Sequence, residues 1–397
     1  MKIAIIADWY SDDMGYAENY LPMALGRLGH EVHLLTSNFQ VYANSPKYDQ
    51  IYRSKLGERQ VSEGVWKKQF FTLHRLRGWI SPVGVHVVGL DSVLRRLRPD
   101  IVYCFEINSP STGVAARHRR TIGYGLFCES RLHASVFPPP SRILSRIKLW
   151  LKNSLVGVAD VIDNVERFYP IAPDVQRIIT QHFGVPSEKC SLSSLAVETD
   201  IFSPRRDAAR IAAFRSKLGL SEGDLLCVYT GRLTPGKGPL VLGKAVDLLQ
   251  RRGSKEVRGL FVGEGEESYR KQISECSGCM IHPFVKPAEL ADIFRSADVG
   301  VWPLQESTSQ LDAMACGLPI IVNDTVNDPL RLGECSLTFS KDSPEALAGR
   351  ILELRDPARR AAMGRIAAAR IAEQGSWDAL ARKRAHDFEV ARAAAAA

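Results

Sequence analysis

The chain has 397 residues, of which 45% are hydrophobic and 24% are charged, and this composition excludes a disordered or fibrous protein. The length predicts two or three globular domains. Lys and Arg number 52 against 44 Asp and Glu, which leaves a net charge of +8. That excess favours an anionic partner, such as nucleic acid, a phosphate-bearing ligand or an acidic membrane surface, without choosing among them.

The cysteines and the apolar runs indicate the cellular compartment of the protein. Eight cysteines are scattered along a chain that is long enough to need no disulfides, so we expect a reducing compartment. Cys276 and Cys279 form a C-x-x-C pair, but no partner pair follows, and ordinary thiols are expected there instead of a zinc site. No apolar run approaches the ~18 residues of a membrane span or forms a signal peptide. We therefore expect a cytoplasmic protein.

The first half of the chain alternates between predicted strands and helices. Residues 3–7 are continuously apolar, as in a strand buried on both faces. A loop with Gly15 at its turn leads to apolar residues at helical spacing over 20–28, and a strand is predicted at 31–37. This order predicts a parallel sheet. A helix at 91–98 and strands at 99–107 and 121–130 continue the alternation.

A second α/β unit begins near residue 205, after the linker candidate 197–207. Strands are predicted at 225–229, 257–265, 298–304 and 318–324, and helices at 240–253, 287–297 and 309–317. Two successive units of this kind predict a pair of Rossmann-like domains, with a ligand cleft where the carboxyl ends of the strands face each other. The Ala-rich segment 366–397 is helical by composition.

The loop at 230–238, TGRLTPGKG, follows a buried strand and carries Arg232 and Lys237 between glycines. Such a loop can bring two cations and exposed backbone amides to one side of a diphosphate. Its spacing is not that of a P-loop. A solvated basic loop is the alternative.

The segment 303–322, PLQESTSQLDAMACGLPIIV, places Glu306 at the end of a strand and Asp312 near the start of a helix. Residues 307–309, Ser-Thr-Ser, are suitable helix caps. The amides of a helix start favour a phosphate, and two carboxylates can accept hydrogen bonds from sugar or ribose hydroxyls. The alternative is that Ser309 only caps the helix and Asp312 only complements its dipole.

Four stretches together give the chain a family resemblance. They are G-Y-x-E with GHEV near the N-terminus, VETDIFSP in the linker, GRLTPGKG, and ESTSQLDAMACGLPIIV. In this order the chain resembles the nucleotide-sugar-dependent glycosyltransferases of glycosyltransferase family 4. The resemblance implies an α/β GT-B fold, in which two Rossmann-like domains face each other across an interdomain cleft. Residues 1–203 would form the acceptor-side domain, 204–375 the donor-binding domain, and a helix at about 376–397 would pack back on the first.

The resemblance also implies roles for individual residues. Arg232 and Lys237 would hold the donor diphosphate and stabilise the departing charge, while Glu306 would bind sugar hydroxyls and Asp312 the ribose. Backbone contacts to the donor are expected from Gly15, Phe284, Thr308, Ser309 and Gln310. No metal and no cofactor are expected, because the nucleotide-sugar is a substrate and the cations would carry the leaving-group chemistry.

Three departures from the family pattern concern the same site. The paired acids of the family are two Glu separated by seven residues, whereas five residues separate Glu306 from Asp312. The Gly-Gly of the first loop is Gly15-Tyr16. Where many relatives carry a His after the strand at 121–130, this chain offers Cys128 and Glu129, with His133 five residues beyond Cys128. These three are the acceptor-side candidates, and His133 is alternatively an ordinary loop histidine.

Residues 141–155, SRILSRIKLWLKNSL, combine apolar residues on one helical face with basic residues mostly elsewhere. This pattern is typical of a basic helix that lies at a membrane interface. It is equally typical of a core helix with solvated basic residues.

The sequence therefore predicts a retaining hexosyltransferase that moves a sugar from a nucleotide-diphosphate donor to a hydroxyl acceptor. The expected context is bacterial surface polysaccharide, lipopolysaccharide or glycolipid synthesis, with a lipid-linked glycan as a candidate acceptor and peripheral attachment to the inner face of the cytoplasmic membrane. A non-catalytic nucleotide-sugar-binding relative is the alternative. A basic nucleic-acid-binding protein and a dehydrogenase are disfavoured, because the chain has neither a nucleic-acid-binding signature nor G-x-G-x-x-G in its first βα turn.

Overall fold

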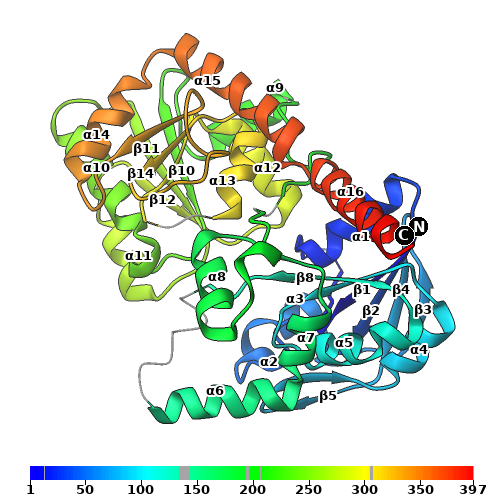
Figure 1. The fold of residues 1–397 in the computed structure, drawn as a ribbon. Coiled ribbons are helices and arrows are strands. Elements are labelled where there is room, and N and C mark those ends of the chain that lie inside the picture. The colour runs from blue at the N-terminus through cyan, green and yellow to red at the C-terminus, as the bar shows by residue number, and fades with distance from the viewer. Residues whose placement is uncertain (13, 134–142, 194–195, 206, 305–306, 397) are drawn as a thin grey trace. The chain divides into compact units, whose positions relative to one another are not determined.

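The computed structural model describes residues 1–397 except 13, 134–142, 194–195, 206, 305–306 and 397 (Figure 1). The chain forms two compact units. Unit 1 comprises Met1–Leu195 and Leu380–Ala397, and unit 2 comprises Ala196–Ala379. Each unit contains a largely parallel sheet with helices packed against it, so the predicted α/β class is confirmed. Among the described residues, no helix is both long enough and apolar enough to cross a membrane.

The sheet of unit 1 has seven strands in the order β3-β4-β2-β1-β7-β8-β9. The strands are β1 (Lys2–Ala7), β2 (Glu31–Ser37), β3 (Gly64–Lys67), β4 (Thr72–Leu76), β7 (Ile101–Phe105), β8 (Gly125–Ser130) and β9 (Arg167–Pro170). All neighbours pair in parallel except β3 with β4. In the central strand Ile3 lies between Val32 and Ile101. Its five residues from Ile3 to Ala7 are buried, as the continuous apolar run predicts.

Helices surround this sheet, and several elements of the unit were not anticipated from the sequence. The helices are α1 (Ala17–Arg27), α2 (Tyr48–Ile51), α3 (Arg53–Leu56), α4 (Leu90–Leu97), α5 (Pro110–Ile122), α6 (Ile143–Val156), α7 (Val158–Asn164) and α8 (Pro173–Ile178). A two-stranded hairpin, β5 (Gly78–Ser81) with β6 (Gly84–Val87), stands apart from the main sheet. The short elements α2, α3 and β3 to β6 lie in a segment where no sequence pattern predicts regular structure.

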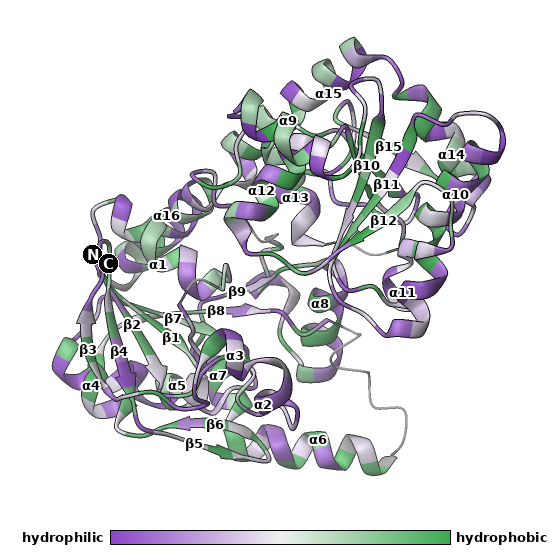
Figure 2. Ribbon diagram, turned by 180° about the vertical axis from the view of Figure 1, so that it is seen from behind, coloured by the Kyte–Doolittle hydropathy of each residue, from purple (hydrophilic) through white to green (hydrophobic). Residues whose placement is uncertain are grey.

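The sheet of unit 2 has six strands, all parallel, in the order β12-β11-β10-β13-β14-β15. The strands are β10 (Leu225–Thr230), β11 (Val257–Val262), β12 (Cys279–His282), β13 (Val299–Trp302), β14 (Ile320–Asn323) and β15 (Ser336–Phe339). The helices are α9 (Ala208–Lys217), α10 (Pro239–Arg251), α11 (Glu267–Ser274), α12 (Pro287–Ser296), α13 (Thr308–Ala315), α14 (Pro344–Glu353) and α15 (Pro357–Arg370). Figure 2 shows hydrophobic strands such as β10 and β11 between helices of mixed polarity.

The last helix, α16 (Trp377–Ala396), completes the core of unit 1. The Phe388 ring lies 4.6 Å from the Phe127 ring of β8, measured between centroids, and is fully buried. The Arg384 guanidinium is also buried and lies 3.4 Å from the centre of the Tyr169 ring in β9. The Tyr169 hydroxyl in turn donates to Asp387 at 2.7 Å. An aromatic and charged contact set therefore joins the end of the chain to strands that precede it by more than 200 residues.

Replacing Phe388 with Ala should destabilise the protein by about 3–5 kcal/mol, because the substitution opens a cavity between α16 and β8. Urea unfolding followed by circular dichroism would measure the free energy of unfolding. Val390→Ala is the matched control, since Val390 lies on the same helix and is 54% exposed. A Phe388 variant that unfolds at the same urea concentration as the Val390 variant would contradict the packing role of α16.

Candidate functional site

The candidate site of unit 2 lies where the strand order changes direction. The chain runs from β10 outward to β11 and β12, then returns to the other side of β10 with β13. In open α/β sheets, ligands bind outside the carboxyl ends of the strands at such a switch point. The loop at 231–238 follows β10, and α13 is the next described element after β13, so the loop and the start of α13 meet there.

The loop after β10 holds two cations close together. Arg232 is exposed, and Lys237 is partly buried in a short 3₁₀ turn, Pro235–Lys237, directly before α10. Burial lowers the pKa of the Lys237 ammonium, and the charge of Arg232 lowers it further. Neither side chain forms an ion pair with any described residue. Two like charges at a strand end, with no counter-charge among the described residues, form a suitable site for an anion.

Glycines allow the neighbouring loops to pack backbone against backbone. A side chain at Gly263, after β11, would place its Cβ 2.0 Å from the carbonyl oxygen of Gly231, and the φ of Gly263 is 147°. At Gly238 a Cβ would lie 2.3 Å from Leu304 Cγ. The N–H of Leu233 also donates to the carbonyl of Glu264 at 2.8 Å. The loop that carries the cations is thus held by close backbone contacts with the loop after β11 and by the close approach of Gly238 to the Leu304 side chain.

Gly263→Ala should therefore destabilise unit 2 by at least about 2 kcal/mol and weaken nucleotide binding, because the new methyl group must displace the loop at Gly231. Gly236→Ala, in the same loop, should change the stability by less than about 0.5 kcal/mol, since a Cβ there meets nothing within 4 Å. Urea unfolding and calorimetric titration with UDP would compare the two variants. Equal stability and equal affinity would show that the close packing does not support the site.

The start of α13 is joined to the end of β10 by side-chain hydrogen bonds. The Ser309 hydroxyl donates to the carbonyl oxygen of Thr230 at 3.2 Å, and the Trp302 indole N–H donates to the same oxygen at 3.0 Å. Ser307 is the N-cap, and its hydroxyl accepts from the Ser309 amide at 3.4 Å. The Ser309 side chain therefore has a structural role at the switch point, in addition to the phosphate contact predicted for its amide.

The other donor-side residues on α13 differ in their surroundings. Gln310 is fully buried, and its side-chain oxygen accepts from Arg331 Nε at 2.7 Å, so the contact predicted for its backbone stays a prediction. Thr308 is the first residue of the helix. Asp312 is partly buried, and burial raises the pKa of its carboxyl to about 8. Glu306 lies outside the described residues, so its predicted contact with the sugar stays a prediction.

The pKa of Asp312 makes the stability of unit 2 depend on pH in a defined direction. An aspartate in the unfolded chain titrates near pH 4, so between about pH 4 and 8 the folded protein binds the extra proton and the free energy of unfolding falls as the pH rises. Asp312→Asn removes this slope, and the variant should gain stability relative to the parent from pH 5 to pH 8. Urea unfolding at several pH values tests this, with the exposed Asp163→Asn as the control. If the difference in free energy of unfolding between Asp312→Asn and the parent does not change with pH, the pKa of Asp312 is not raised.

Phe284 lies in the loop after β12, where its ring is 58% exposed. Its N–H donates to a carboxylate oxygen of Glu264 at 3.4 Å, which joins this loop to the one after β11. Glu264 was not predicted from the sequence, where its only signal is its position in the GEG triplet at 263–265, directly after a strand. The proposed contact between the backbone at Phe284 and the nucleotide base stays a prediction.

The predicted residues of unit 1 lie at the carboxyl edge of its sheet, in different environments. Gly15 precedes α1 with a φ of 73°, a conformation that suits glycine. Cys128 is fully buried in the core under β8. Glu129 is also buried, and it accepts hydrogen bonds from the Tyr103 hydroxyl at 2.8 Å and from Arg131 Nε at 2.9 Å. His133 is partly exposed and lies 3.2 Å from Asp174. Cys128 thus packs in the core, and the acceptor-side roles of Glu129 and His133 stay predictions.

Two further acids at this edge were not singled out from the sequence. Asp8 follows β1 and accepts hydrogen bonds from the Ser109 and Ser111 hydroxyls, both at 2.8 Å, and burial raises the pKa of its carboxyl to about 6. Glu106 follows β7 with a φ of 73°, and burial raises the pKa of its carboxyl to about 7. Both acids flank the switch between β1 and β7, so position at a strand end was the signal that could have identified them.

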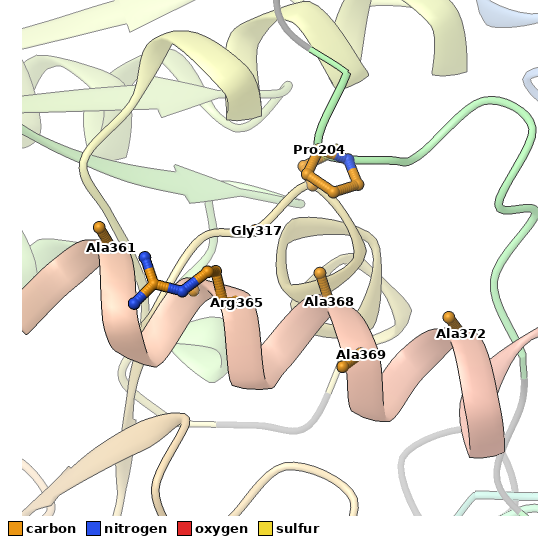
Figure 3. A pocket seen from close by; sticks show the side chains of 9 residues that line it. Pro204, Gly317, Ala361, Arg365, Ala368, Ala369 and Ala372 are labelled. Atoms are coloured by element: carbon orange, nitrogen blue, oxygen red, sulfur yellow. The ribbon is translucent and has the colours of Figure 1, made fainter.

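A shallow pocket of about 540 Å³ lies elsewhere in unit 2, between α15 and the turn after α13 (Figure 3). Small side chains and backbone line it, with Arg365 as the one charged residue of the lining. None of the predicted site residues contributes to this pocket.

Part of the chain matches a known protein family and several curated proteins. Residues 224–356 match the family model described as "Glycosyl transferases group 1". The D-inositol 3-phosphate glycosyltransferase of Segniliparus rotundus is 27% identical over 242 residues, which cover 57% of this chain and 53% of that protein. The chain thus spans about half the length of the curated relatives it matches.

Solved structures extend the likeness over the whole chain. Sucrose-phosphate synthase from Thermosynechococcus elongatus superposes with a TM-score of 0.68 at 17% identity and 99% coverage of both chains. The Anabaena HepE structure in complex with UDP gives a TM-score of 0.67 at 15% identity, covering 98% of this chain and 100% of that one. The chain therefore has the GT-B fold of glycosyltransferases, as its sequence predicts. The match of residues 224–356 to the group 1 family model agrees with this fold, and together they confirm the predicted resemblance to a GT-B glycosyltransferase.

Proposed function

We propose that the protein is a glycosyltransferase that moves a sugar from a nucleotide-diphosphate donor to a hydroxyl acceptor with retention of anomeric configuration. The observation that carries the proposal is the pair Arg232 and Lys237 at the switch point of unit 2, where no described acid forms an ion pair with either side chain. The family match over 224–356 and the UDP complex of a structural neighbour support a nucleotide-sugar donor. A diphosphate bound there would supply the negative charge that the two cations lack.

In the proposed reaction the bond between the anomeric carbon and the diphosphate oxygen breaks, and the diphosphate leaves with the bonding electrons. Arg232 and Lys237 stabilise the charge that develops on it. The acceptor oxygen attacks the same face of the sugar, and its proton passes to the departing diphosphate. The proposed reaction requires no metal ion or cofactor. By resemblance, Glu306 and Asp312 orient the sugar and the ribose.

Arg232→Ala and Lys237→Ala should each lower the transfer rate by roughly 10²-fold or more at saturating donor, as expected for the loss of a group that stabilises the leaving charge. Initial rates with a panel of UDP-, GDP- and ADP-sugars measure this, and donor hydrolysis serves where no acceptor is known. Lys244→Ala, an exposed lysine on α10, is the matched control. Near-normal turnover in both variants would refute the leaving-group role.

The altered spacing of Glu306 and Asp312 favours one alternative, a relative that binds nucleotide-sugars without transferring the sugar. The donor panel separates the two proposals, because such a relative would bind a donor in a thermal-shift assay and would neither hydrolyse nor transfer it.

For the biological context we propose synthesis of a bacterial surface polysaccharide, lipopolysaccharide or glycolipid, with a hydroxyl of a lipid-linked glycan as the acceptor. The eight cysteines are free thiols, which supports a reducing compartment such as the cytoplasm. The charge excess of +8 supports work next to an acidic surface on the inner face of the cytoplasmic membrane.

A further inference from the structure

Helix α6 of unit 1 exposes an apolar face to solvent. Five large side chains of this 14-residue helix are 48–75% exposed, namely Leu144, Ile147, Trp150, Leu151 and Leu155. At about 100° per residue these positions fall within one arc of the helix. For these side chains the core-helix alternative is wrong.

The opposite side of α6 attaches the helix to unit 1. Leu149 packs against the core of the unit, and Val156 is buried in it. Because this second set of apolar residues anchors the helix, the exposed face is not needed for folding. An exposed apolar face that no described part of the chain covers indicates a binding surface.

The charges on α6 suit an anionic layer. Lys148 and Lys152 border the exposed face on one side, and neither forms an ion pair with a described residue. The helix sequence contains no Asp or Glu. Lysines that flank an apolar face, with a Trp at its other border, are typical of a helix that lies in the plane of a membrane interface.

The hairpin β5–β6 of the same unit also exposes apolar side chains. Trp79 in β5 is 52% exposed and Ile80 is 42% exposed. Exposed large apolar side chains of unit 1 are therefore not confined to α6.

We infer that α6 binds the surface of an anionic lipid bilayer, with its exposed apolar face at the acyl boundary and Lys148 and Lys152 at the headgroups. A second copy of the chain suits this face less well. A two-fold contact through α6 would bring the lysines of both copies together, with no acid on either helix to pair with them. The inference goes beyond the transfer reaction and does not depend on it.

The apolar part of the inference is tested by co-sedimentation of the full chain with vesicles. The vesicles are equal mixtures of phosphatidylglycerol and phosphatidylcholine, compared with phosphatidylcholine alone. The parent protein should bind the anionic vesicles at low salt. Trp150→Ser with Leu151→Ser should weaken binding at least roughly tenfold and leave the melting temperature unchanged, because both side chains are exposed. Val390→Ser, at an exposed residue of α16, is the matched control.

The role of the charges is tested with the double variant Lys148→Glu and Lys152→Glu. This variant should lower the affinity for anionic vesicles by roughly 25-fold or more and remove the salt dependence of binding. Lys67→Glu, at an exposed lysine of β3, should change binding little. Failure of the parent to bind anionic vesicles would overturn the inference, as would unchanged binding in both α6 variants. Dimerisation in light scattering that only the α6 variants abolish, without vesicle binding, would assign the face to a second copy. Donor hydrolysis is measured separately, so failure here leaves the proposed function standing.

Discussion

Parallel pairing places the carboxyl ends of all six strands of unit 2 along one edge of its sheet, and the order of those strands decides which loops meet there. The chain leaves β10 in one direction and returns on its other side, so the loop with Arg232 and Lys237 and the start of α13 become neighbours. The carbonyl oxygen of Thr230 accepts hydrogen bonds from Trp302 and Ser309 at this point. These bonds fix the end of β13 and the start of α13 to the end of β10, beside the loop that carries the two cations.

Burial places the charged groups of the site in unfavourable surroundings. Lys237 is partly desolvated beside another cation, and burial favours the neutral form of the Asp312 carboxyl. Such groups reduce the stability of the protein, and they persist because the sheet and the close-packed glycine loops hold them in position.

The sequence predicted the elements whose local residue pattern alone determines their structure. Continuous apolar runs became β1 and β10, and Ser307 caps the helix that was expected after it. The hairpin β5–β6 was missed because each strand has only four residues, too few for the alternation in β6 to stand out, and β5 shows no alternation. Glu264 was missed because only the tertiary structure brings its loop beside Phe284. For α6, the apolar pattern was visible, but amphipathicity alone does not tell which of two apolar sets meets the core, and Leu149 with Val156 decides it.

The placement of α16 in the core of unit 1 has a consequence for biosynthesis. Unit 2 is one continuous stretch of chain, whereas unit 1 needs residues 380–397, which are synthesised after unit 2. The aromatic side chains of β8 and β9 that contact Phe388 and Arg384 are therefore made more than 200 residues before their partners on α16. Unit 1 thus cannot complete its core until unit 2 has been translated, and its early strands rely on cellular chaperones or on transient contacts in the meantime.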